Sequence, residues 1–173
     1  MSKDINVVAA LIFKDNKVLI AKRSTDKDAK GKWEFPGGKV EENEDEKIAI
    51  EREIYEEFDV KVKAKDFISQ STFNYPHGNV ILKLYECEYI DGNFKLHAHS
   101  EYTWVKIDDL LNYDLAPADI PLAKDVMEKY KDFIINYFIN AYCRLCSKRL
   151  LFFTWWCCRM FFPLTRAEPI KIF

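Results

Sequence analysis

The sequence predicts a fold of the α/β (α+β) class, in which strands outnumber helices and mix with them along the chain. Several segments rich in β-branched and aromatic residues are bounded by turn residues, as strands are. Other segments repeat apolar residues at helical spacing. The 173 residues suffice for one domain, and no internal repeat is present.

The first expected elements are a hairpin and a glycine-rich loop. Residues 6–13 (NVVAALIF) and 17–23 (KVLIAKR) flank a polar turn, which predicts two paired strands. Residues 31–39 (GKWEFPGGK) predict a short strand that enters a Pro-Gly-Gly loop.

Residues 44–58 predict a helix. Ile50, Ile54 and Phe58 recur every four residues and form its buried stripe. Asn43 is the expected N-cap, and Glu46 three residues later completes a capping-box pattern.

The second half of the chain predicts further strands and two helices. The expected strands cover residues 58–75, 78–90 and 102–107. The expected helices cover residues 108–113 and 121–130, and the second has Pro121 in its first turn and one apolar face.

The composition changes sharply after residue 132, so we expect a domain at 1–132 and a separate tail at 133–173. The tail holds 11 of the 26 aromatic residues and six basic residues against one acidic residue, which leaves 20 basic and 27 acidic residues in the domain. We interpret the tail as a non-native extension or a reading-frame artefact. The alternative is a segment that lies on a membrane surface or covers a partner.

Cysteine usage and charge exclude several classes of protein. Cys143 and Cys146 lack a second pair at zinc-ribbon spacing, so we expect no zinc site. No uncharged run is long enough for a transmembrane span and no signal-peptide pattern is present, so we expect a cytoplasmic protein. The acidic domain is a poor match for duplex nucleic acid, whereas a polyphosphate carried on metal ions remains compatible.

The predicted helix at 44–58 carries an unusual group of carboxylates. Helical spacing places Glu53, Glu56 and Glu57 along one edge, where they repel one another unless a cation lies among them. Magnesium or manganese with oxygen ligands would resolve that repulsion. Arg52 is expected to pair with Glu44 or to orient a catalytic carboxylate. The alternative is an ordinary solvated charged face.

The spacing of these residues resembles the Nudix box, Gly-x5-Glu-x7-Arg-Glu-U-x-Glu-Glu-x-Gly-U, where U is a bulky aliphatic residue. The matching positions are Gly38, Glu44, Arg52, Glu53, Ile54, Glu56, Glu57 and Val60. Asp59 replaces the usual glycine, and aspartate tolerates the left-handed conformation that a helix end often needs. The segments VVAALIFKDNKVLIAKRS, KWEFPGGKVE and YDLAPADIPL extend the resemblance to the MutT-type branch of the Nudix hydrolase superfamily, most closely its bacterial CTP pyrophosphohydrolases, over about residues 4 to 130.

The resemblance implies the Nudix α/β/α sandwich with a mixed β-sheet and magnesium-dependent hydrolysis of nucleoside triphosphates to monophosphate and pyrophosphate. It implies metal-site roles for Gly38, Glu53, Glu56 and Glu57, with Glu53 also handling the proton of the attacking water and Arg52 and Glu44 in support. It further implies that Arg23 and Lys39 lie near the phosphates.

The segment KLHAHSEYTW differs from the family. Relatives often carry a glutamate where this chain has Ala98, so either Glu101 substitutes or the box acts alone. We expect His97 and His99 to be ordinary exposed loop residues rather than metal ligands, because magnesium prefers oxygen.

In the resembled enzymes the position of Asp119, within LAPADIPL, reads the base. An ionised Asp119 accepts from an exocyclic amine such as that of cytosine, and a protonated one donates to a ring atom. The alternative is an N-cap for the final helix. Phe35 and Phe73 are candidates to stack on the base, or else core residues.

These observations predict hydrolysis of CTP, dCTP or modified cytidine nucleotides by a monomer or homodimer. Within the same chemistry, the alternative is an 8-oxo-dGTP-type diphosphatase that sanitises the nucleotide pool. The alternatives without this chemistry are a non-catalytic Nudix-fold nucleotide-binding module and a protein whose function lies in the tail.

Overall fold

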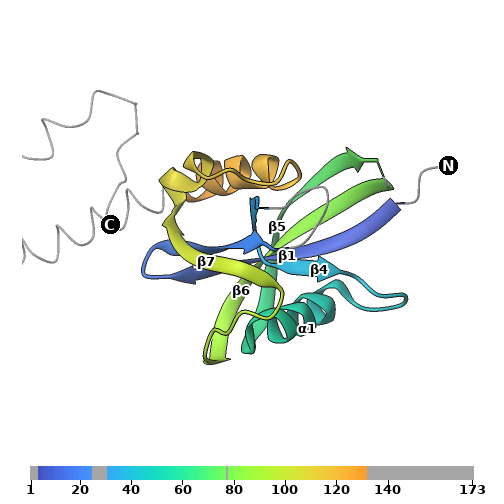
Figure 1. Ribbon diagram of the computed structural model, residues 1–173, viewed down its shortest axis with the longest axis horizontal. Coiled ribbons are helices and arrows are strands. Elements are labelled where there is room, and N and C mark those ends of the chain that lie inside the picture. Colours follow the sequence, from blue (N-terminus) through green and yellow to red (C-terminus); the bar gives the residue numbers. More distant parts are fainter. Residues whose placement is uncertain (1–3, 25–30, 77, 132–173) are drawn as a thin grey trace, which may run out of the picture. The chain divides into compact units, whose positions relative to one another are not determined.

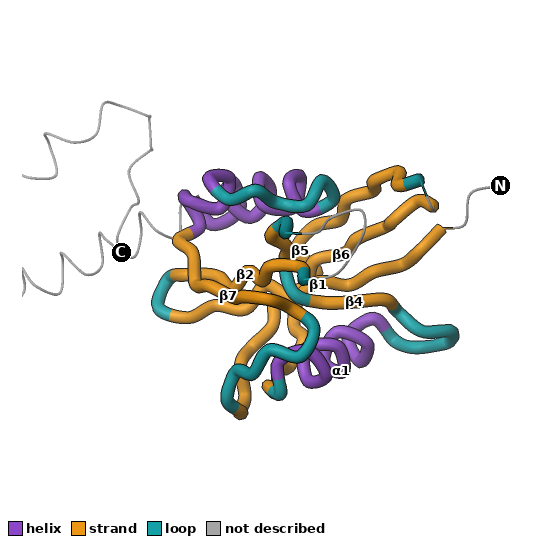
Figure 2. The backbone as a smooth tube through the Cα atoms, in the orientation of Figure 1, coloured by secondary structure: helices purple, strands orange, loops and turns teal. Residues whose placement is uncertain are grey.

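A computed structural model describes residues 4–24, 31–76 and 78–131 of the chain. Its described strands form one mixed sheet, and this confirms the predicted fold class. The helix α1 (Glu46–Phe58) and the helix at 119–131 lie on opposite sides of the strands (Figure 1, Figure 2). The predicted tail at 133–173 lies outside the described residues. Within the described ranges, no helix is long and apolar enough to cross a membrane.

The sheet has the order β3-β2-β1-β6-β5, with β4 paired to β1 and β7 paired to β2. Its strands are β1 (Asp4–Lys14), β2 (Lys17–Arg23), β3 (Trp33–Glu34), β4 (Gly37–Lys39), β5 (Val60–Tyr75), β6 (Gly78–Gly92) and β7 (His99–Lys106). A short 3-10 helix, η1 (Ile107–Asn112), follows β7 where a helix is expected. The β1–β6 pair is parallel and the other pairs are antiparallel, so the chain must cross over between β1 and β6.

The predicted hairpin between β1 and β2 is present. Asp15 and Asn16 at its turn have φ angles of 49° and 60°. Two consecutive positive φ angles are typical of the tight turn whose twist matches the flanking strands, and Asp and Asn tolerate them.

Strand β1 separates the core from the ligand-sized cavity described below. Val8, Ala10 and Ile12 alternate along β1 and belong to the same buried cluster as Ile50 and Ile54 of α1. The intervening side chains point to the opposite face, because successive residues of a strand alternate.

The start of α1 differs from the prediction. The helix begins at Glu46 rather than residue 44, and Asp45 rather than Asn43 caps it by accepting from the amides of Lys47 (2.9 Å) and Ile48 (3.3 Å). Asn43 has a φ of 63°, which places it in the preceding turn. The predicted capping box is therefore wrong, since the carboxylate of Glu46 accepts from Lys83 and Tyr85 instead.

The end of α1 agrees with the prediction. Asp59 occupies the left-handed conformation (φ 58°, ψ 32°), and its amide donates to the carbonyl of Tyr55 at 2.9 Å. Lys95 pairs with the Asp59 carboxylate at 2.6 Å, and this ion pair lowers the pKa of Asp59.

Gly92, at the end of β6, offers a test of the close contact between β5 and β6. Its φ is 115°, and a Cβ there would lie 2.6 Å from the carbonyl oxygen of Asp59. We expect Gly92→Ala to lower the free energy of unfolding by about 3 kcal/mol, because backbone strain and a steric clash add. Urea denaturation measures this change.

Gly31→Ala is the matched control. Gly31 also has a positive φ (77°), but a Cβ there would meet no atom within 4 Å. Backbone strain alone should lower the free energy of unfolding of Gly31→Ala by about 1 kcal/mol. Equal losses in the two variants would contradict a steric role for the Gly92 contact.

Candidate active site

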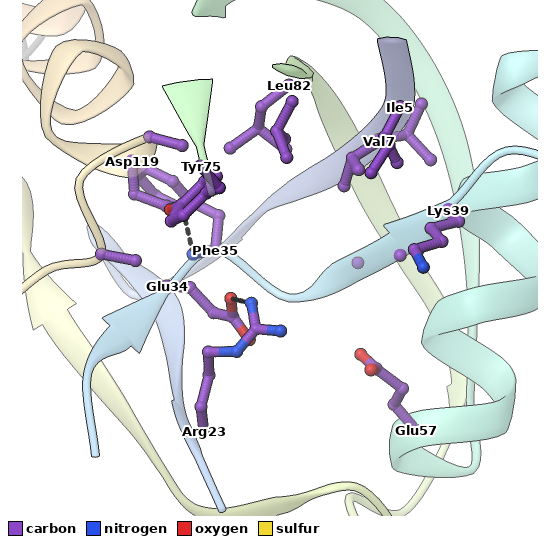
Figure 3. A pocket seen from close by; sticks show the side chains of 16 residues that line it. Ile5, Val7, Arg23, Glu34, Phe35, Lys39, Glu57, Tyr75, Leu82 and Asp119 are labelled. Atoms are coloured by element: carbon purple, nitrogen blue, oxygen red, sulfur yellow. Dashed lines mark hydrogen bonds and ion pairs between the residues drawn. The ribbon is translucent and has the colours of Figure 1, made fainter. Parts of the chain in front are cut away.

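A cavity of about 250 Å³ lies beside β1 and β4. Its size is near the lower end of small-molecule sites, which span roughly 300–1,000 Å³. Figure 3 shows the apolar side chains of Ile5, Val7 and Leu82 on one side and the charged Glu34 and Glu57 on another. The cavity thus joins an apolar wall to a cluster of charges.

Two glycines allow β4 to lie close to its neighbours. A Cβ on Gly37 would lie 2.8 Å from the Cα of Ala9 in β1. A Cβ on Gly38 would lie 2.6 Å from Oε1 of Glu53, and closer still to the other carboxylate atoms. Any larger residue at Gly38 would therefore displace Glu53.

Arg52 organises the carboxylates of the acidic helix. Its Nε and Nη2 donate to the two carboxylate oxygens of Glu44, both at 2.8 Å. Its Nη1 donates to Glu53 at 2.9 Å and to Glu56 at 3.4 Å, and Nη2 also donates to the carbonyl of Lys39 at 3.2 Å. The bidentate bond from Arg52 lowers the pKa of Glu44 to about 2, and the same bond raises the pKa of Arg52. The expected Arg52–Glu44 pair is present, and Arg52 also holds Glu53.

The three glutamates of the helix edge have different surroundings. Glu53 lies between Arg52 and Gly38, whereas the side chain of Glu56 is 58% exposed. Glu57 points into the cavity (Figure 3). Among the described residues no three acidic, histidine or cysteine groups already meet at one point. The sequence placed the three glutamates on one edge; in the fold, Glu53 and Glu56 both contact Nη1 of Arg52, whereas Glu57 lines the cavity.

The carboxylate of Glu57 is the most perturbed on the helix. Burial raises its pKa to about 7; His99 opposes the shift and the negative charges of Glu34 and Glu53 add to it. Its Oε2 is buried and has no hydrogen-bond partner among the described residues. This atom is 3.9 Å from Nδ1 of His99, which also lacks a partner.

His99 differs from the sequence expectation. His97 is exposed, as expected for a loop residue, but His99 is only 8% exposed and begins β7. Its Nε2 donates to Oε1 of Glu34 at 3.0 Å. The interpretation of His99 as an exposed loop residue is therefore wrong, because β7 pairs with β2 and buries it against α1.

The two expected phosphate-binding residues both line the cavity. Arg23 pairs with Glu34 at 2.5 Å, and Lys39 extends from β4 at the opposite side (Figure 3). Glu101 does not line the cavity; it lies on β7, where it pairs with Lys22 at 3.7 Å. The carbonyl of Ala98 accepts from Ser24 at 2.6 Å.

Asp119 is buried at one end of the cavity. Its Oδ1 accepts from the amide of Phe35 at 2.9 Å, so the carboxylate binds the β3–β4 connection instead of capping its own helix. Burial raises the pKa of Asp119 well above its ordinary value, and the negative charge of Glu34 adds to the shift. Asp119 can therefore be protonated when ordinary aspartates are ionised.

The structure separates the two aromatic residues expected to contact a base. Phe35 lines the cavity and is 3% exposed. Phe73 is 37% exposed, is not among the lining residues, and packs on Tyr75 at 4.8 Å between ring centroids. Tyr75 lines the cavity instead, from the end of β5.

Sequence reasoning missed Glu34, Tyr75 and His99 as cavity or site residues. Residues 73 and 75 share one face of β5 by alternation, so the pattern could identify the face but not the position nearest the cavity. Glu34 lies within the quoted KWEFPGGKVE segment, but its role depends on Arg23 and His99, which are distant in sequence.

The donors around Gly38 fit a hard divalent cation. Carboxylates and backbone carbonyls are the ligands that magnesium prefers. The partnerless Oε2 of Glu57 and the Glu53 carboxylate, which lies against the backbone of Gly38, are features that such an ion would use.

Asp119→Asn should change the pH dependence of stability. A raised carboxyl pKa means that the folded state holds the proton more tightly, so the contribution of Asp119 to stability is lost as pH rises above the unfolded pKa of about 3.9. Relative to Asp119→Asn, the wild-type free energy of unfolding should fall by about 1.4 kcal/mol per pH unit until the folded pKa is reached. Urea denaturation at several pH values measures the difference, and parallel curves would show that Asp119 is not protonated in the fold.

Comparisons with known proteins agree with this geometry. The NUDIX domain family matches residues 3–126. The chain is similar to a CTP pyrophosphohydrolase of Escherichia coli (strain K12), with 35% identity over 72% of this chain and 93% of the relative. It is also similar to a putative 8-oxo-dGTP diphosphatase 2 of Mycobacterium tuberculosis (strain H37Rv), with 32% identity over 65% of this chain and 81% of the relative.

A solved structure shows the same fold. The solution structure of DNA mismatch repair protein MutT (family Nudix hydrolase) from methicillin-resistant Staphylococcus aureus 252 has a TM-score of 0.63 and 42% identity. The match covers 75% of this chain and 99% of that protein. The box residues, the mixed sheet and these matches together show that the chain belongs to the Nudix hydrolase family and is MutT-like.

Proposed function

We propose that this protein is a magnesium-dependent nucleoside triphosphate pyrophosphohydrolase that favours cytidine nucleotides. The observation that carries the proposal is one cavity with a buried acid, Asp119, at one end and Glu57 at the other; Gly38 also lines it. A base and a polyphosphate need these two kinds of surroundings. The similarity to a CTP pyrophosphohydrolase supports the same substrate.

The metal-binding side consists of Glu53, Glu56, Glu57 and the backbone of Gly38. When bound there, magnesium, or manganese in its place, would neutralise polyphosphate charge and lower the pKa of a water molecule. Arg52 orients the carboxylate of Glu53 through its hydrogen bond and neutralises part of the local negative charge. Glu53 would accept the proton of the attacking water as general base.

Arg23 and Lys39 would bind the phosphates. Both are cationic, both line the cavity, and they enter it from different strands. The ion pair with Glu34, at 2.5 Å, already orients the side chain of Arg23. Arg23 therefore loses less conformational freedom when substrate binds.

Protonation of Asp119, which its raised pKa favours, would suit cytosine better than guanine. A protonated carboxyl donates through its O–H and accepts at its carbonyl oxygen, which matches the adjacent N3 acceptor and 4-amino donor of cytosine. Guanine presents two adjacent donors on this edge, and an ionised carboxylate would suit them better. The raised pKa of Asp119 therefore supports the cytidine proposal.

The direct test is a panel of CTP, dCTP, UTP, ATP and 8-oxo-dGTP with magnesium, followed by identification of the products. We expect CTP or dCTP to be cleaved with the highest kcat/KM and to yield monophosphate and pyrophosphate. Preference for 8-oxo-dGTP would favour the second candidate, which the similarity to a putative 8-oxo-dGTP diphosphatase supports. Nucleotide binding without cleavage of any nucleotide would identify a binding module instead.

Glu53→Gln tests the assigned base. The amide keeps the size of the side chain and can still contact Arg52, but it cannot accept a proton from water. We expect kcat to fall by about 10²–10⁴-fold, the usual contribution of a general base.

Glu88→Gln is the matched control. Glu88 is an exposed residue of β6 that pairs with Lys65 of β5, and it does not line the cavity. Its kcat should equal that of the wild type. An unchanged kcat in Glu53→Gln would assign the base to another residue.

A further inference from the structure

The imidazole of His99 occupies a buried position between α1 and β3. It stacks on the ring of Phe58, the last residue of α1, with centroids 5.2 Å apart and planes inclined by 18°. The backbone of His99 is fixed by the pairing of β7 with β2, where it lies opposite Arg23. One ring face and the backbone of His99 are therefore fixed, so its two nitrogens have defined directions.

Each nitrogen of His99 faces a different carboxylate. Nε2 donates to Oε1 of Glu34 at 3.0 Å, and Nδ1 lies 3.9 Å from Oε2 of Glu57. The other oxygen of Glu34 accepts from Arg23 at 2.5 Å. His99 consequently lies between Glu57, a proposed metal ligand, and Glu34. Glu34 in turn orients Arg23, a proposed phosphate-binding residue.

We propose that His99 is a positioning residue that fixes Glu57 on the metal-binding side and Glu34 with Arg23 on the phosphate-binding side of the cavity. The inference rests on the proposed function, because it takes Glu57 as a metal ligand and Arg23 as a phosphate-binding residue. An apolar ring would fill the same space and stack on Phe58, so packing alone does not account for two polar edges that each face a carboxylate. Residues that orient metal ligands in this way commonly alter affinity when they are replaced.

Three variants separate the two contacts. His99→Gln places an amide near the position of Nε2 and retains a donor for Glu34, whereas His99→Asn places its amide near Nδ1 and retains a polar group toward Glu57. His99→Phe keeps a ring against Phe58 and removes both polar edges. The matched pair, Gln and Asn, is the decisive comparison.

The measurements use the full chain. Binding of Mn²⁺ to the substrate-free protein is followed by the electron paramagnetic resonance signal of free Mn²⁺, KM and kcat are measured with CTP and magnesium, and the thermal midpoint is recorded for each variant. We expect His99→Gln and His99→Phe to weaken Mn²⁺ binding by about 10–100-fold. His99→Asn should bind Mn²⁺ as the wild type does but should raise KM for CTP, while His99→Gln should leave that KM unchanged when magnesium is saturating for every variant.

Each outcome decides the inference. Wild-type Mn²⁺ affinity and KM in all variants, with only a lower thermal midpoint, would overturn it and leave His99 a packing residue. Equal losses in the Gln and Asn variants would overturn it as well, because the two contacts would not be separable. If His99→Phe does not fold, the Gln and Asn pair still gives the answer.

Failure of the proposed function gives a different pattern. A wild-type protein that cleaves no nucleotide contradicts the proposed function, yet the Mn²⁺ titration still tests the positioning of Glu57 by His99. A wild-type protein that binds no Mn²⁺ contradicts both proposals. An active wild type with unaltered His99 variants contradicts the inference alone.

Discussion

The close approach of β4 to β1 on one side and to α1 on the other is the constraint on which the site depends. At Gly37 and Gly38 there is no room for a side chain, because the backbone of β1 and the carboxylate of Glu53 occupy that space. The approach brings a glycine backbone, an acidic helix and the wall of the cavity together. A side chain at Gly37 would clash with the backbone of β1, and one at Gly38 would displace the carboxylate of Glu53.

Arg52 makes this concentration of negative charge tolerable. It binds Glu44 through two hydrogen bonds and contacts Glu53, Glu56 and the carbonyl of Lys39. Its planar guanidinium can contact several acceptors at once, which a lysine ammonium could not do with the same geometry. The same interactions that keep Glu44 ionised also fix the orientation of Glu53 toward Gly38.

Burial raises the pKa of one carboxyl at each end of the cavity, Glu57 and Asp119. Near α1 it leaves an oxygen of Glu57 and a nitrogen of His99 without hydrogen-bond partners among the described residues. At Asp119 it raises the pKa of the carboxyl, although the Phe35 amide favours the ionised form. Strand β1 connects these two ends, since one of its faces packs on α1 and the other contributes Ile5 and Val7 to the cavity.

The class of fold, the hairpin, the buried stripe of α1 and the left-handed helix end at Asp59 are predictable from local sequence, because each depends on residues within a few positions of one another. Local sequence also determined which carboxylates share the edge of α1, since helical period alone places them there. The tertiary structure decided which of those carboxylates face the cavity, that Tyr75 rather than Phe73 lines it, and that His99 is buried. It also gave Asp119 the amide of Phe35 as its partner, 84 residues away in sequence. Such contacts join strands and helices that are remote in the chain, and local periodicity carries no information about which remote residues will meet.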